Sequence, residues 1–195
     1  MGFYGTATNA RGFLRDPNGK ITLFDPSEST STLPTAINSS GVIAGSYLDA
    51  TGVRHGFVRH TQGNFSSFIP QHSTSFLVDS INSSNKIVGS YTDASGAEHG
   101  YMRDAAGTIT SFDVPGSTLT NFFDINNKGE IVGLYRDGDI DQHGFVRKAN
   151  GSIVLFDAPD ATETIPEGIN DSGLVAGSEN AANGVYQGLL YMLPN

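Results

Sequence analysis

Short runs of β-branched and aromatic residues alternate along the chain with clusters of Gly, Asn, Asp and Ser. Residues 76–115 show the pattern most fully: apolar, β-prone residues concentrate at 76–81, 86–91, 99–103 and 108–113, and a turn-forming cluster follows each run. β-Branched and aromatic residues favour strands, whereas the residues of the clusters favour tight turns. The pattern therefore predicts four antiparallel strands joined by short connections.

This four-strand pattern is an internal repeat. A glycine near the start of the third strand recurs at a constant spacing of 44 residues, at Gly12, Gly56, Gly100, Gly144 and Gly188. A period of roughly 40 to 50 residues built from short strands is typical of β-propeller blades. We therefore predict a single all-β domain over residues 1–195, a β-propeller with four-stranded blades.

The strand count limits how such a propeller could close. The second and third strands of the repeat occur five times each and the first and fourth four times each, which makes eighteen strands. Five blades with three-stranded first and last blades would use all of them, and four blades would leave the N-terminal hairpin over. We prefer five blades closed through the N- and C-terminal strands, because closure removes exposed sheet edges. Four blades, or strand exchange between molecules, remain as alternatives.

The charge of the chain disfavours some partners. There are 11 Lys and Arg residues against 20 Asp and Glu residues, a net charge of −9. Phosphate backbones and anionic membranes are poor partners for such a surface, so we predict binding to neither nucleic acid nor membrane. The chain has no cysteine, and a domain of this size can bury enough apolar surface without disulfides.

Several sequence segments resemble the HAF-type extracellular repeats of bacteria. They are the segments at 12–25, 36–47 and 49–57, which read GFLRDPNGKITLFD, AINSSGVIAGSY and DATGVRHGF. The resemblance covers nearly the whole chain and implies a propeller in a secreted or extracellular protein, but it supplies no catalytic motif. The last copy departs from the pattern at three positions, Glu179, Gln187 and Tyr191.

The start of the chain bears on its localisation. It shows no signal peptide, and no run of residues is apolar and long enough to span a membrane. Residues 1–4 enter the repeat inside a strand. We therefore expect a segment of a longer secreted precursor, with a natural start as the alternative.

Tyrosine and histidine recur at fixed positions of the repeat, where a polar ligand could contact them. Tyrosine closes the second strand and histidine opens the third, and both are candidate ligand-binding residues: Tyr47, Tyr91, Tyr135, His55, His99 and His143. A sugar could stack on the tyrosine rings. The alternative is that these rings only pack between blades.

The hairpin between the third and fourth strands predicts cross-strand pairs. If Arg103 opposes Ile109, the same register places a basic residue opposite an aspartate in three copies: His99 and Asp113, His143 and Asp157, Arg11 and Asp25. In the second copy His55 faces Ile69 instead. A repeated pair of this kind is typical of a hydrogen bond or ion pair that ties two strands together, rather than of a unique catalytic constellation.

Two carboxylate groups are candidates for chemistry. Asp79, Asp124 and Glu167 stand near the start of the first strand, where they could ring a channel mouth and bind a cation or act as acid and base. The alternative is that they are simply solvated. Asp137, Asp139 and Asp141 alternate in one turn with a spacing that suits Ca²⁺, although the distant bidentate Glu of a helix-loop-helix calcium site is missing. An acidic exposed hairpin is the alternative, and no other cofactor is predicted.

Two further residue types recur in every full copy. We interpret the arginines that end the third strand as partners of turn carboxylates: Arg15, Arg59, Arg103 and Arg147. We interpret the asparagines that follow the first strand as turn residues whose side chains bond their own backbone: Asn38, Asn82, Asn126 and Asn170.

These observations favour a non-catalytic, lectin-like binding module for carbohydrate or another polar extracellular ligand, acting as a monomer. One alternative is a hydrolase or lyase with a single site at the channel mouth, carried by Asp79, Asp124 and Glu167. The other is a purely structural or protein-interaction repeat. No nucleophile elbow, phosphate loop or Cys/His metal motif is present, and the sequence leaves open whether the protein is an enzyme.

Overall fold

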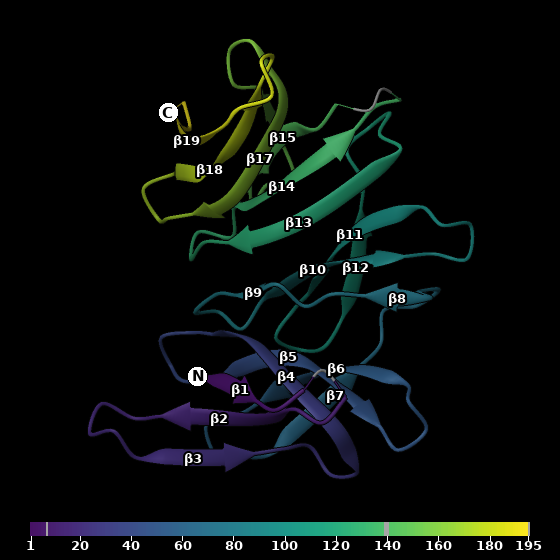
Figure 1. Cartoon of the computed structure of the whole chain (residues 1–195), viewed down its shortest axis with the longest axis vertical. Coiled ribbons are helices and arrows are strands. Elements are labelled where there is room, and N and C mark those ends of the chain that lie inside the picture. The colour runs from purple at the N-terminus through teal and green to yellow at the C-terminus, as the bar shows by residue number, and fades with distance from the viewer. Residues whose placement is uncertain (7, 139–140, 195) are drawn as a thin grey trace.

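The computed structural model of the chain describes residues 1–6, 8–138 and 141–194, and it is all-β (Figure 1). The first sheet contains β1 (Gly2–Tyr4), β2 (Arg11–Arg15) and β3 (Ile21–Phe24). The second contains β4 (Ser29–Ile37), β5 (Ile43–Asp49), β6 (Arg54–Arg59) and β7 (Phe65–Phe68). The last contains β17 (Ala161–Ile169), β18 (Leu174–Ala181) and β19 (Tyr186–Met192).

The third sheet has nine strands and spans two copies of the repeat. Its first five strands are β8 (Ser75–Phe76), β9 (Ser80–Ile81), β10 (Ile87–Thr92), β11 (Glu98–Arg103) and β12 (Ile109–Phe112). Its other four are β13 (Leu119–Ile125), β14 (Ile131–Arg136), β15 (His143–Arg147) and β16 (Ile153–Phe156). A parallel bridge between Glu98 of β11 and Leu119 of β13 joins the two copies.

The prediction of all-β hairpins is confirmed, but the prediction of a closed propeller is wrong, with five blades or with four. The sheets follow one another along the long axis of the molecule, with β1–β3 at one end and β17–β19 at the other (Figure 1). Within the described ranges no strand of the first sheet pairs with a strand of the last, so the terminal strands close no ring. The repeat period reports hairpins inside each copy, whereas closure depends on how successive sheets pack, which the period does not encode.

Successive sheets pack through their first strands. β4 contacts β1 and β2, β9 contacts β4 and β5, and β17 contacts β13 and β14. The apolar core between them is dense: Phe57, Tyr101 and Phe145, which follow the repeated glycine, are fully buried. The second strand of the repeat carries a glycine where a side chain would collide with its neighbours. In β14, a Cβ at Gly133 would collide with the backbone carbonyl of Asn121 and with the Phe145 ring.

A ladder of asparagine side chains also joins consecutive copies. The side-chain Nδ2 donates to the backbone carbonyl of the asparagine 44 residues later, from Asn38 to Asn82 at 3.0 Å, from Asn82 to Asn126 at 3.1 Å and from Asn126 to Asn170 at 3.0 Å. The Oδ1 atom of each accepts backbone N–H groups of its own turn. The predicted turn role is therefore confirmed, and the side chains of Asn38, Asn82 and Asn126 additionally bond their copy to the next.

The repeated arginines stack on phenylalanine rings of the preceding copy. The guanidinium carbon lies 5.0–5.2 Å from the ring centroid in three pairs, Arg59 on Phe24, Arg103 on Phe68 and Arg147 on Phe112. No ion pair of these three arginines occurs in the described part of the chain, so the prediction of carboxylate partners is wrong for them. A planar guanidinium gains cation–π attraction and apolar contact from such a ring, and sequence spacing within one copy does not reveal contacts between copies.

Candidate binding site

One copy of the repeat has a broken first strand. The corresponding strands β4, β13 and β17 are continuous but carry a bulge at the position equivalent to Asp79, whereas β8 and β9 are separated by residues 77–79. The backbone N–H groups of Leu77 and Asp79 still bond to β10, at 2.8 and 3.0 Å. The Tyr101 hydroxyl donates to the Leu77 carbonyl at 2.7 Å, and no such bond is available at Phe57 and Phe145, the equivalent positions of two other copies. The Tyr101 contact therefore distinguishes this copy from those of Phe57 and Phe145.

A cavity of about 560 Å³ lies beside this break. Six of its lining residues come from elements of both sheets or carry polar or aromatic groups: Thr35, Arg54, Asp79, Glu98, Asn121 and Phe123. They come from β4, β6, the break, β11 and β13, so the cavity lies between the second and third sheets. Its volume is within the range of sites that hold small molecules.

The Asp79 side chain lines this cavity without a partner. It is partly buried, and among the described residues its carboxylate accepts no hydrogen bond, while its Oδ2 atom is itself buried. Burial disfavours the charged form and raises the pKa of Asp79 to about 7. Near neutral pH the cavity thus holds a carboxyl group close to the midpoint of its titration.

The other polar groups of the cavity are held in place by neighbours. Arg54 Nη1 donates to the Ser46 hydroxyl at 2.9 Å, and Asn121 Nδ2 donates to Glu98 Oε2 at 2.8 Å. In the described ranges, Arg54 makes no ion pair within 4.0 Å. The buried Oδ1 of Asn121 also lacks a partner there. The site can consequently offer a positioned cation together with carboxylate and amide acceptors.

The predicted channel-mouth carboxylates are not brought together. Thr35, Asp79 and Phe123 occupy the same repeat position and all line the cavity, but Glu167, at that position in the next copy, is exposed and does not. Among the residues with described positions, no group of three His, Cys, Asp or Glu side chains could hold a metal ion.

Asp124 lies in a different hollow, of about 360 Å³, on the side of the asparagine turns. Its Oδ1 accepts a 2.6 Å hydrogen bond from the Ser80 hydroxyl, and its Oδ2 accepts the Ile169 N–H at 2.9 Å. These contacts join three successive copies of the repeat. Asp124 is thus engaged in structure and is separate from the Asp79 cavity.

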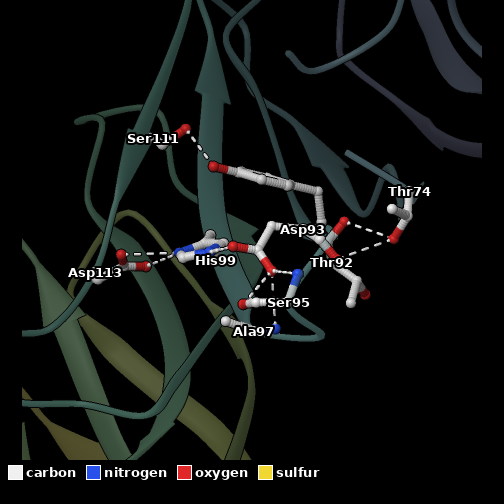
Figure 2. A network of polar contacts seen from close by, with 9 residues as sticks. Thr74, Thr92, Asp93, Ser95, Ala97, His99, Ser111 and Asp113 are labelled. Atoms are coloured by element: carbon white, nitrogen blue, oxygen red, sulfur yellow. Dashed lines mark hydrogen bonds and ion pairs between the residues drawn. The ribbon is translucent and has the colours of Figure 1, made fainter. Parts of the chain in front are cut away.

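The histidine pairs follow the predicted register. His99 Nδ1 lies 2.9 Å from Asp113 Oδ2, and its Nε2 lies 3.4 Å from Asp93 in the preceding turn (Figure 2). Asp93 in turn accepts the hydroxyl and N–H of Ser95 and the N–H of Ala97 (Figure 2). The Ser95 hydroxyl, with the other donors, lowers the pKa of Asp93 to about 2. Burial is the largest single effect and opposes protonation of His99, but the hydrogen bonds and negative charges of Asp113 and Asp93 together outweigh it and raise the pKa of His99.

Equivalent pairs occur in other copies. Arg11 Nε lies 2.6 Å from Asp25, and His143 Nδ1 lies 3.1 Å from Asp157. In the second copy, where the register offers Ile69, His55 Nε2 instead lies 2.8 Å from the turn residue Asp49. The predicted interpretation of these pairs as strand ties is confirmed by these contacts.

The tyrosines proposed as stacking platforms pack on the histidines of their own copies. Ring centroids are 4.9 to 5.1 Å apart in three pairs, Tyr47 with His55, Tyr91 with His99 and Tyr135 with His143. Only 9% of Tyr91 and 8% of Tyr135 is exposed. These rings are therefore committed to packing, although Tyr91 also lines the cavity.

The predicted calcium turn is only partly described, because Asp139 lies outside the described residues. Asp137 Oδ1 lies 3.8 Å from His143 Nε2, the same relation that Asp93 has to His99. Asp137 thus has a structural contact of its own.

Sequence reasoning missed the residues that make the cavity polar. Arg54 and Glu98 occupy the same position in consecutive copies, and Asn121 replaces the leucine found at Leu33 and Leu77. Tyr101, which donates to the Leu77 carbonyl within the break, replaces a phenylalanine. These departures from the repeat were the sequence signal from which the cavity could have been found, because a residue that recurs in every copy stabilises the fold.

Comparison with known proteins shows the fold alone. No known protein family matches the sequence, and no curated protein matches it. A similar solved structure is that of TolB from Acinetobacter baumannii, with a TM-score of 0.62 at 11% sequence identity. The similarity covers 96% of this chain and 50% of the TolB chain, so the chain spans about half the length of that protein. The described residues contain no helix that is long and apolar enough to cross a membrane.

Proposed function

We propose that the protein is a non-catalytic binding module that takes one polar, saccharide-like ligand in the cavity beside the β8–β9 break. The observation that carries this proposal is the composition of that cavity. The partly buried ring of Phe123 stands with Arg54, Asp79 and Glu98 around one space. A pyranose offers an apolar face for a ring and a hydroxyl edge for charged acceptors and donors, which is the combination that this cavity would recognise.

A single site is better supported than one site per copy. The tyrosine and histidine rings that recur in each copy contact one another, so they offer little free surface. The break between β8 and β9, by contrast, occurs in one copy among the described strands. Features outside the repeat are where a specific site is expected, because repeated contacts serve the scaffold.

The hydrolase or lyase alternative receives less support. It rested on three carboxylates at one mouth, and these lie in separate places: Asp79 in the cavity, Asp124 in the second hollow and Glu167 at the surface. Acid and base catalysis requires groups within reach of one reacting bond.

The test is calorimetric titration with four tetrasaccharides: cellotetraose, mannotetraose, chitotetraose and tetraglucosamine. We expect at least one to bind with one site per chain. Phe123→Ala should weaken that binding about tenfold or more, since a lost ring contact costs about 1.5 kcal/mol. Glu167→Ala, at the exposed equivalent position, is the matched control and should leave binding unchanged.

Two results would overturn the proposal. One is the absence of binding by every tetrasaccharide, which would favour the structural or protein-interaction alternative. The other is binding at several sites per chain that is indifferent to Phe123→Ala.

A further inference from the structure

We propose that the ligand of this cavity carries a protonated amine, which Asp79 receives, so that an amino sugar fits it better than a neutral or N-acetylated one. This inference rests on the proposed function and names its ligand class. It is carried by the unpartnered carboxylate in the cavity wall and by the absence, among the described residues, of a cation paired with it.

Asp79 is a buried acceptor in need of a donor. Its carboxylate accepts no hydrogen bond within the described part of the protein, and the Oδ2 atom is buried. A carboxylate that loses water without gaining a donor is strongly unfavourable. A ligand that brings a charged donor to this position removes that penalty when it binds.

Within the described residues, no basic side chain forms an ion pair with Asp79. Arg54 is the only basic side chain of the described residues that lines the cavity, and its guanidinium is bound to Ser46 Oγ at 2.9 Å. The remaining acidic group, Glu98, is held by Asn121 at 2.8 Å and keeps free lone pairs. Two carboxyl groups against one guanidinium leave a local need for positive charge.

An ammonium group satisfies this need better than an acetamide. It has three donors and a full positive charge, and a charge-assisted hydrogen bond is roughly twice as strong as a neutral one. An N-acetyl group has one donor, no charge and an added carbonyl acceptor. The net charge of −9 favours the approach of a cationic ligand as well.

The pH dependence follows from the groups around Asp79. Arg54, Glu98 and Tyr91 line the same cavity, and the Tyr101 hydroxyl on β11 interacts electrostatically with Asp79. Burial raises the pKa of Asp79 to about 7, so acidification below this value neutralises the carboxylate and weakens the attraction for an ammonium. The amine itself only gains protons on acidification, so its titration would act in the opposite direction.

The experiment compares tetraglucosamine with chitotetraose, its fully N-acetylated counterpart, by calorimetry at pH 7.0 in the presence of EDTA. The two probes share one backbone and differ at the amines. We expect tetraglucosamine to bind about tenfold more tightly or better to the native chain, and this preference to fall to about twofold or less in Asp79→Asn. Glu167→Gln removes the same charge from the equivalent exposed position, so it controls for non-specific attraction and should keep the preference.

Each outcome has a distinct meaning. Equal affinity for the two probes, or a preference that survives Asp79→Asn, overturns the amine inference and leaves the proposed function standing. Failure of all four tetrasaccharides overturns the proposed function itself. A second measurement needs no substitution: in the native chain the preference should decline from pH 7.5 to pH 5.5, and a preference that is flat or grows on acidification overturns the inference.

Discussion

At the residue scale, the Asp79 carboxyl lies in a cavity wall without a hydrogen-bond donor among the described residues. Burial raises its pKa from 3.8 to about 7. The folded protein therefore keeps a proton that the unfolded chain releases between about pH 4 and pH 7. Because the folded state binds more protons in this window, the free energy of unfolding falls as the pH rises through it.

The first prediction concerns this pH dependence. Between pH 5 and pH 8 the native chain should lose about 2.7 kcal/mol of unfolding free energy more than Asp79→Asn does, because about two pH units of this range lie below the raised pKa and each contributes 1.36 kcal/mol. The raised pKa of His99 acts in the same direction, but it is common to both proteins and cancels in the difference. Urea denaturation at the two pH values measures it. Identical pH profiles for the two proteins would show that the Asp79 carboxyl is solvated or paired.

At the element scale, the asparagine ladder holds successive copies together. Each rung serves two purposes: Oδ1 caps its own turn, and Nδ2 donates to the next copy. Asn82 is almost fully buried and makes both kinds of bond. Asn170 caps its own turn in the same way, but within the described residues its Nδ2 has no partner. The two positions therefore separate the turn contribution from that of the ladder.

The second prediction uses this difference. Asn82→Asp retains the turn acceptor but places a second acceptor against the Asn126 carbonyl, and should cost about 1–3 kcal/mol of unfolding free energy. Asn170→Asp keeps the turn and loses no such bond, so it should change stability by less than about 0.5 kcal/mol. Chemical denaturation at pH 7 measures both. Equal costs at the two positions would mean that the ladder contributes nothing beyond the turns.

Much of the element structure could be predicted from the sequence. The segments 86–91, 99–103 and 108–113 correspond to β10, β11 and β12, because alternating β-prone runs and turn clusters are local signals. The predicted strand at 76–81 is instead broken into β8 and β9. The break coincides with a contact from Tyr101 on another strand, and local sequence patterns do not reveal such contacts.

At the scale of the whole molecule, the sheets form an open succession, with β1–β3 and β17–β19 at opposite ends (Figure 1). The sequence suggested a closed ring because its repeat count and terminal strands would permit one, yet packing between sheets decides the outcome. Where two sheets meet, departures from the repeat produce the cavity at Asp79. The sequence identified Asp79 as a candidate, but it did not identify Arg54 and Glu98, which line the same cavity. A repeat period does not show which residues of different copies come together.

The central claim is that one ligand binds once, in the cavity beside the β8–β9 break. Amide chemical-shift mapping tests it most directly, with the tetrasaccharide that binds most tightly. The account predicts shifts concentrated at Asp79 and Phe123, and none at Glu167, which holds the same repeat position outside the cavity. Shifts of comparable size around Tyr47 and Tyr135, or no shifts with any of the four tetrasaccharides, would contradict it.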